Sequence, residues 1–585
     1  MVEFKNIFIK FSLLFGILAT VSIIFGVFHY AHFGFELSDE TFYLYHSNYY
    51  NPNKFITSNF GILNKIVCFG NPTLINLRYA KLIYQLISVL LFVWSLLKYL
   101  KHKSIVLTKT TNIFVYTIIL ATSFGHYDYL PMTLSYNSWS LILMLLVFSL
   151  IFIELLRKKT ISSVITSFLM GILCFCLFIT KFPNSIIVVG IYAFFNLFYI
   201  KKDTLVKIMG FVIGLFIAFF LILKNTHNLF ALIENYRITI FDIKHAESNL
   251  YFKQIYKILI ICSEHKVYSF FFISVLLIML IVGYFLMKKV KNNTSSKKYI
   301  YCYMLLICEL LLSVIFIKGN GHKTYNDFIS VSILIINPYL FVYLYKYDYV
   351  TGLSFFKNEL NVVILTLLIT PVLLMLGTNN AFYYSISPTM VFAFSSSLIY
   401  LLKSNKNNEY YLSVYNMVLC LFILTILYFG AVKKPYRQTN LNDKTSPLSF
   451  SPLLLGIYES RDAFVDYSSV NYILNILNKE HKPFLTFFEF YGFTIINNNP
   501  ISTDLPLSSQ ERSLEYDDYM LKRSDIIIDK PLLLIPESVI INSKFIQLFQ
   551  SNNIYLNQNY KLIYRYKFKS NDETINFYKI ITKYK

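Results

Sequence analysis

The sequence predicts an all-α polytopic membrane domain followed by a small α/β domain outside the membrane. Hydrophobic residues make up 56% of the 585 residues and the mean hydropathy is +0.53, which is too apolar for a soluble protein of several domains. The apolar residues form runs of roughly twenty residues, the length that crosses a bilayer. These runs stop after residue 431, where charged and turn-forming residues appear. We therefore expect a membrane domain over residues 1–431 and a second domain over residues 432–585.

The membrane domain is expected to contain about thirteen transmembrane helices. The predicted spans are 11–29, 81–98, 111–125, 137–155, 162–180, 184–200, 206–223, 268–287, 299–317, 327–345, 361–376, 389–402 and 411–431. Lys5 and Lys10 precede the first apolar run and no small-residue cleavage site follows it. We interpret this run as a retained signal-anchor helix.

The basic residues indicate which side of the membrane each connection faces. In a soluble protein, the formal net charge of +21 would suggest nucleic-acid binding, but here Lys and Arg cluster between apolar runs. The clusters occupy alternate connections, at 98–109, 157–159, 201–202, 288–298 and 403–406. The positive-inside rule places them and the N-terminus in the cytoplasm. The first loop (30–80) and the C-terminal domain are then expected outside the cytoplasmic membrane.

Residues 432–585 have the patterns of a small α/β domain. We expect strands at 453–458, 484–490 and 532–536, a helix at 465–479, and a hairpin from 561–568 and 575–583. The domain has no glycine-rich phosphate loop and no Ser-His-Asp or Cys-His spacing. We therefore expect it to cap the membrane domain.

The residues most indicative of chemistry follow the first span. The segment from Glu36 through Asp39 and Glu40 places three carboxylates next to an apolar bundle. An ordinary solvated loop would also explain them, as would a helix N-cap in which Ser38 or Asp39 precedes a helix that begins near Glu40. The rest of the first loop mixes aromatic residues with Asn, Pro and Gly, which is typical of short amphipathic helices at a membrane interface.

These features together resemble a known family. The chain resembles the GT-C glycosyltransferases in four features. It has an Asp-Glu pair after the first span, aromatic residues behind that pair (Phe42, Tyr43, Tyr45), Arg78 at the second span and an external C-terminal domain. The most similar branch contains the bacterial lipid A aminoarabinose transferases and protein O-mannosyltransferases of glycosyltransferase family 39. The architecture matches over the whole membrane region. The residues match specifically only at Asp39-Glu40, with weaker matches at 181–183 and 135–137.

The resemblance implies an integral-membrane glycosyltransferase that takes a sugar from a polyprenyl-phosphate donor. The acceptor would be an envelope lipid, glycan or protein on the extracytoplasmic face, and transfer would invert the anomeric centre. Asp39 would act as the base, with Glu40 as its orienting neighbour or a sugar ligand. The donor-phosphate candidates are Lys181, Arg78, Lys318, His322 and Lys323. The sugar or acceptor candidates are Asp128, Tyr136 and Asn137.

Two of these residues also have structural explanations. Lys181 would also be explained by snorkelling to the interface, and Tyr136 by an interfacial aromatic belt. No cofactor is expected. A divalent metal is the alternative, because His29, His32 and His46 flank the acids, but their spacing is not a recognised ligand set.

Two other functions remain open. A transporter or flippase of lipid-linked sugars would favour charges within the spans, internal repeats and broken helices, whereas Glu309 is the clearest acid within a span. A surface polysaccharide polymerase or ligase would place its large external loop late in the chain.

Overall fold

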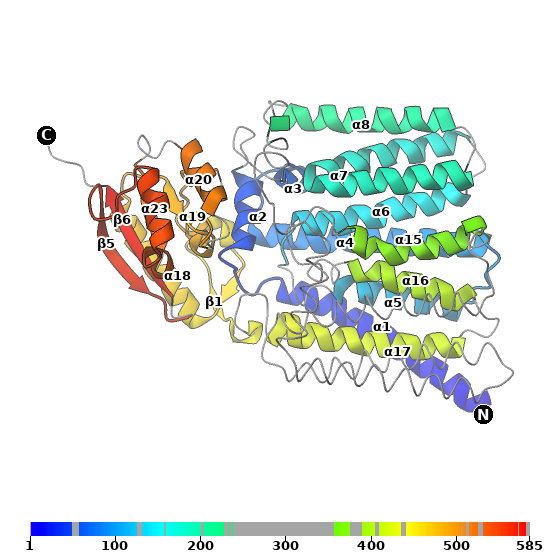
Figure 1. Cartoon of the computed structure of the whole chain (residues 1–585). Coiled ribbons are helices and arrows are strands. Elements are labelled where there is room, and N and C mark those ends of the chain that lie inside the picture. Colours follow the sequence, from blue (N-terminus) through cyan, green and yellow to red (C-terminus); the bar gives the residue numbers. More distant parts are fainter. Residues whose placement is uncertain are drawn as a thin grey trace.

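The computed structural model describes most of the chain outside its middle third. The described residues are 2–49, 58–125, 132–156, 160–200, 204–226, 233–234, 237, 356–374, 389–403, 409–433, 440–504, 506–509, 514–524, 530–570 and 573–580. Helices that run along a common axis form a bundle, and a smaller domain lies at one end of it (Figure 1). The N-terminus lies at the opposite end of the bundle.

The described helices of the bundle correspond to the predicted spans. They are α1 (Val2–Tyr30), α4 (Leu74–His102), α5 (Lys109–Phe124), α6 (Tyr136–Leu156), α7 (Thr160–Phe195), α8 (Thr204–Thr226), α15 (Glu359–Leu373), α16 (Met390–Lys403) and α17 (Glu409–Ile426). Short π-helical segments, η2 (Asn196–Ile200) and η6 (Leu427–Lys433), extend α7 and α17. Within the described part of the chain, six helices are long and apolar enough to cross a membrane, as expected for a multi-pass membrane protein. The spans at 268–287, 299–317 and 327–345 lie outside the described residues, so the total of about thirteen stays a prediction.

Helix α7 is a hairpin that contains two of the predicted spans. The backbone of Lys181 is non-helical (φ −153°, ψ 83°), and Pro183 follows it. The hydroxyls of Ser167 and Tyr192 are 2.6 Å apart, and the Cys174 thiol lies 3.6 Å from the Ser185 carbonyl. Residues so far apart along a straight helix could not meet, so the chain reverses at Lys181. The predicted connection between spans 162–180 and 184–200 is thus confirmed.

Glycines allow α7 and α8 to pack closely. A Cβ atom at Gly171 would lie 2.1 Å from the Phe211 carbonyl oxygen, and one at Gly214 would lie 2.0 Å from that of Phe168. No larger residue fits at either position unless the helices separate. Small residues at such contacts are typical of membrane helix pairs, which associate by backbone approach.

Basic residues gather at the bundle end that lies away from the C-terminal domain. The Lys103 ammonium forms an ion pair of 3.0 Å with Glu359, and Lys403 donates to Asn361 at 2.8 Å. Lys5 lies over the ring of Tyr410, 5.7 Å from its centroid. This gathering agrees with the charge pattern in the sequence. The cytoplasmic assignment of this end remains a prediction.

The C-terminal domain is a small α/β unit. Its main sheet has the order β3 (Phe484–Thr486), β4 (Leu532–Pro536), β6 (Thr574–Ile580) and β5 (Tyr560–Lys567), and only the β3–β4 pair is parallel. A second sheet pairs β1 (Ser446–Pro447) with β2 (Tyr458–Glu459). The helices of the domain are α18 (Arg461–Leu477), α19 (Gly492–Ile496), α20 (Leu514–Arg523), α22 (Glu537–Ile540) and α23 (Ser543–Ser551), with 3-10 turns η7 (Leu441–Asp443), η8 (Pro452–Leu454) and η9 (Phe488–Phe490).

The sequence predicted the long helix and the last three strands of this domain. The strand at 532–536 and the hairpin of β5 and β6 are confirmed, and α18 begins four residues before the predicted helix. The strand predicted at 453–458 is wrong. Pro452 begins the 3-10 turn η8, and Gly456 has φ +84°, so an extended strand is interrupted before β2. The strand predicted at 484–490 ends at Thr486, and η9 follows it.

The first external loop contains two short helices, α2 (Asp39–Asn48) and α3 (Phe60–Val67). Both lie at the bundle end that adjoins the C-terminal domain (Figure 1). The short helices that the composition of this loop predicted are therefore present. They place the acidic segment at the junction between the two domains.

Candidate active site

Glu36 caps the helix that carries the acidic pair. Its carboxylate accepts hydrogen bonds from the Ser38 and Glu40 backbone N–H groups, each at 3.1 Å, and from the Ser38 hydroxyl. A carboxylate at this position satisfies N–H groups that a helix leaves without partners and complements its dipole. Ser38 holds the cap position but makes no side-chain cap bond. The predicted helix start is confirmed, whereas the predicted capping side chain, Ser38 or Asp39, is corrected to Glu36.

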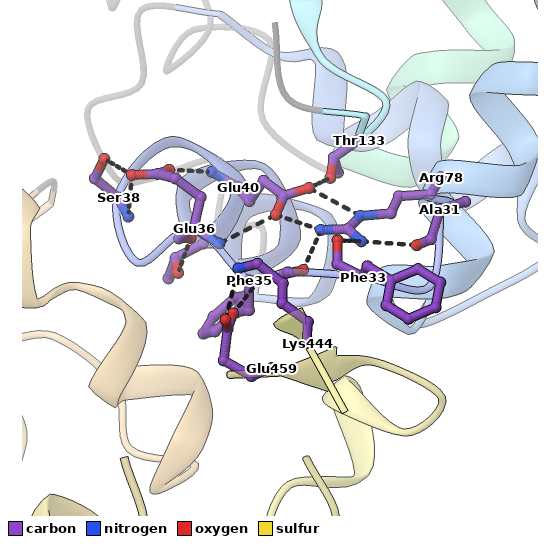
Figure 2. A network of polar contacts seen from close by, with 12 residues as sticks. Ala31, Phe33, Phe35, Glu36, Ser38, Glu40, Arg78, Thr133, Lys444 and Glu459 are labelled. Carbon is purple, nitrogen blue, oxygen red and sulfur yellow. Dashed lines mark hydrogen bonds and ion pairs between the residues drawn. The ribbon is translucent and has the colours of Figure 1, made fainter. Parts of the chain in front are cut away.

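Glu40 forms a buried ion pair with Arg78 of α4 (Figure 2). Glu40 is 0% exposed and Arg78 is 1% exposed. The Arg78 Nη2 and Nε atoms donate to the two carboxylate oxygens at 2.6 and 3.0 Å. The Thr133 hydroxyl and the Glu36 backbone N–H also donate to Glu40. The Glu40 carboxylate is thus fully surrounded by donors.

The remaining donors of Arg78 hold the loop between α1 and α2. They reach the carbonyl oxygens of Ala31 at 2.7 Å, Phe33 at 3.2 Å and Gly34 at 2.6 Å. With the two bonds to Glu40, these contacts use all five N–H groups of a guanidinium. The geometry therefore does not support Arg78 as a ligand of the donor phosphate. It also places Glu40 as a structural partner of the loop rather than as a group that contacts substrate.

Lys81 is a charged residue that the sequence reasoning missed. It lies one helical turn after Arg78, is 0% exposed, and interacts electrostatically with both Glu40 and Arg78. Gln85 continues the same face of α4 and donates to the Ser123 carbonyl at 2.6 Å. The i, i+3, i+7 spacing of these polar residues within an apolar helix was a signal for a buried polar stripe.

Asp39 differs from its two acidic neighbours. It is the first residue of α2 and remains partly exposed, whereas Glu36 and Glu40 are buried. It lies close enough to Tyr136, at the start of α6, to interact with it electrostatically. The Tyr136 hydroxyl also hydrogen-bonds with Asn137 and Tyr43. The structure thus places Asp39 near Tyr136, while the sugar or acceptor roles of Tyr136 and Asn137 stay predictions.

Lys181 lies at the turn of the α7 hairpin, at the same end of the bundle. Its ammonium donates to the Leu374 carbonyl at 2.8 Å, where α15 ends. A cation there complements the negative end of the helix dipole. The neighbouring Ile179 carbonyl accepts from the Asn59 backbone N–H at 2.8 Å, so the hairpin turn contacts the first loop. An ammonium has three donors, and this contact uses one of them.

The other predicted site residues are not tested. Asp128, Lys318, His322 and Lys323 lie outside the described residues, so their roles stay predictions. In the described part of the chain, no group of three His, Cys, Asp or Glu residues gathers where it could hold a metal ion. His32 instead lies at the domain junction, where Nδ1 is 2.9 Å from the Gly456 carbonyl and Nε2 is 2.5 Å from the Tyr79 hydroxyl. The expectation of no cofactor remains open.

Comparisons with protein-family models, with curated proteins and with solved structures find no match for this chain.

Proposed function

We propose that this protein is an integral-membrane glycosyltransferase that moves a sugar from a polyprenyl-phosphate donor to an envelope acceptor. The observation that carries the proposal is the contrast within one acidic segment. Glu36 and Glu40 are buried, whereas Asp39 between them is partly exposed and lies near Tyr136. A carboxylate held at a fixed position, with its neighbours anchored and its own side chain accessible, is suited to general-base chemistry.

In the proposed reaction, Asp39 accepts the proton of an acceptor hydroxyl or amine. The acceptor atom forms a bond to the anomeric carbon, and the bond from that carbon to the phosphate oxygen breaks on the opposite face. The phosphate leaves with the electron pair, and the configuration is inverted. Because negative charge grows on the phosphate, a nearby cation lowers the barrier. Lys181 is our candidate for that cation, and Tyr136 and Asn137 for contacts with sugar hydroxyls.

A lipid-linked donor suits the surroundings of Lys181. The second half of the α7 hairpin begins directly after it, and Ile186 and Val189 on this half are 59% and 41% exposed. Apolar side chains on the outside of a membrane helix face the hydrocarbon region. A polyprenyl chain could lie along them while its phosphate stays at the end of the bundle. We therefore favour a lipid-phosphate donor over a nucleotide sugar.

Transfer of label from radiolabelled polyprenyl-phosphate sugars tests the proposal. Membranes that contain equal amounts of wild-type protein or Asp39→Asn are incubated with donor, and label is measured in lipid, glycan and protein fractions. We expect label in one acceptor fraction with wild type and a loss of at least 100-fold with Asp39→Asn. Intact donor that crosses the bilayer without losing its sugar would instead support a flippase and contradict the proposal.

A further inference from the structure

The segment of residues 31–38, which leads into Asp39, is held on two sides. Arg78 of the bundle binds three of its carbonyl groups, as described above. On the other side, the C-terminal domain contributes a parallel β-bridge between Phe33 and Tyr458. In it, the Tyr458 N–H donates to the His32 carbonyl and the Gly34 N–H donates to the Tyr458 carbonyl, both at 2.8 Å. The path of this segment thus depends on both domains.

Glu459 adds a buried side-chain contact to this bridge (Figure 2). One carboxylate oxygen accepts from the Phe35 backbone N–H at 2.9 Å. The other accepts from the Lys444 ammonium at 2.5 Å and from the Ser460 N–H at 2.9 Å. Burial lowers the pKa of Lys444, and the charge of Glu459 opposes that shift. The carboxylate therefore links a residue four positions before Asp39 to a buried charge of the C-terminal domain.

Gly492 contacts the segment still closer to Asp39. Its N–H donates to the Leu37 carbonyl at 2.7 Å. A Cβ atom at this position would lie 2.2 Å from Leu37 Cδ2 and 3.1 Å from Leu37 Cα. A side chain here would have to displace Leu37, which is two residues before Asp39. Only glycine allows the approach that the structure shows.

Charged groups of both domains are buried together at the junction. Glu40 and Arg78 belong to the membrane domain, and Lys444 and Glu459 belong to the C-terminal domain. Lys444 of the C-terminal domain interacts electrostatically with Glu40 and Arg78 of the membrane domain. Removal of one member leaves a partner charge buried without compensation. The two domains therefore share a buried ionic network.

From these contacts we infer that the C-terminal domain sets the position of Asp39, with Glu459 and Gly492 as positioning residues. The domain is then part of the active site rather than only a cap. This inference rests on the proposed function. Both residues act through backbone groups of Phe35 and Leu37. A displacement of about 1 Å at a catalytic group reduces rates roughly 100-fold.

The first test compares rates of sugar transfer from a radiolabelled polyprenyl-phosphate donor by the full chain. We expect Glu459→Ala to lower kcat by about 100-fold with little change in the KM for donor. Glu459→Gln keeps an oxygen for the Phe35 N–H but leaves Lys444 uncompensated, so adding Lys444→Met should restore much of the rate. Glu480→Ala is the matched control, because Glu480 is an exposed acid of the same domain that pairs with Lys482. A Glu459→Ala protein with wild-type kcat would overturn the inference.

Gly492→Ala provides an independent variant. We expect a lower kcat that Leu37→Ala partly rescues, because the second change removes the side-chain atom closest to the new methyl group. Gly26→Ala is the control, since a Cβ atom at Gly26 meets nothing within 4 Å. Unchanged kcat in Gly492→Ala would also contradict the positioning role.

Hydrogen–deuterium exchange in peptides from residues 31–45 separates this inference from the proposed function. Glu459→Ala and Gly492→Ala should increase exchange there, whereas the two control variants should not. If wild type transfers no sugar, the proposed function fails and exchange alone tests the inference. Unchanged exchange in both variants would overturn it, whatever the enzymatic result.

Discussion

Replacement of Arg78 by Met gives the sharpest test of the loop architecture. The substitution removes two hydrogen bonds from Glu40 and one from each of three carbonyl groups in residues 31–34. Glu40 keeps its contacts with the Thr133 hydroxyl and the Glu36 N–H, but its charge stays buried. Breaking such a buried pair destabilises a protein by about 3–5 kcal/mol. That is a large share of a typical unfolding free energy of about 5–15 kcal/mol.

The assay is thermal unfolding of the purified full chain in detergent, followed by circular dichroism. Arg78→Met should lower the midpoint by several degrees. The double variant Glu40→Gln/Arg78→Met removes both charges and should recover part of the loss, with a coupling energy of about 0.5–3 kcal/mol. Lys522→Met breaks an exposed ion pair with Asp518 and should change stability by less than about 1 kcal/mol.

Donor binding by the same variants distinguishes the two roles considered for Arg78. If Arg78 only supports the loop, the fraction of Arg78→Met that remains folded should bind the phosphate-bearing donor with an affinity close to that of wild type. Wild-type stability together with lost donor affinity would refute the structural argument and restore Arg78 as a phosphate ligand.

Three further predictions concern other parts of the molecule. Burial raises the pKa of Asp517 to about 8 in the folded state, above its usual 3.8, so the folded chain keeps a proton that the unfolded chain releases. The free energy of unfolding should therefore fall as the pH rises from about 4 to about 8, by up to about 1.4 kcal/mol per pH unit. In Asp517→Asn the thermal-unfolding midpoint should depend less on pH over this range. An unchanged pH dependence of the midpoint would contradict the raised pKa. Lys181→Met removes the bond to the Leu374 carbonyl and should reduce stability by about 1 kcal/mol and donor affinity at least about tenfold in a donor-binding assay. If affinity is retained, Lys181 does not bind the phosphate. Gly214→Val would force α8 away from the Phe168 carbonyl and should destabilise the detergent-solubilised chain by at least about 1–3 kcal/mol. Gly190→Val is the control and should not destabilise it, because a Cβ atom at Gly190 meets open space. Equal thermal-unfolding midpoints for the two variants would refute the close packing of α7 and α8.

The sequence predicted features that depend on local patterns. The turn of the α7 hairpin was readable from Lys181 and Pro183, and the alternation in the last residues predicted the hairpin of β5 and β6. The strand expected at 453–458 failed because Pro452 and Gly456 act against an apolar run that otherwise suits a strand. In such a segment, the backbone preferences of Pro and Gly override the strand preference of the apolar residues.

The site was predictable only in part, for a different reason. The acidic segment could be found, but the role of each carboxylate depends on partners far away in the sequence. Arg78 is 38 residues from Glu40, and Glu459 is 424 residues from the Phe35 backbone that it binds. A basic residue near an expected site looks like a ligand until its partners are known. The spacing of polar residues on α4 could have indicated that Lys81 is buried.

The most direct test of the account is a paired measurement of transfer and stability on Asp39→Asn and Glu40→Gln. Both substitutions replace a carboxylate by an amide of similar size at adjacent positions. We predict that Asp39→Asn keeps the thermal midpoint of wild type and loses transfer, while Glu40→Gln lowers the midpoint because Arg78 loses its buried counter-charge. If Asp39→Asn transfers sugar at the wild-type rate, Asp39 is not the base and the central claim is contradicted.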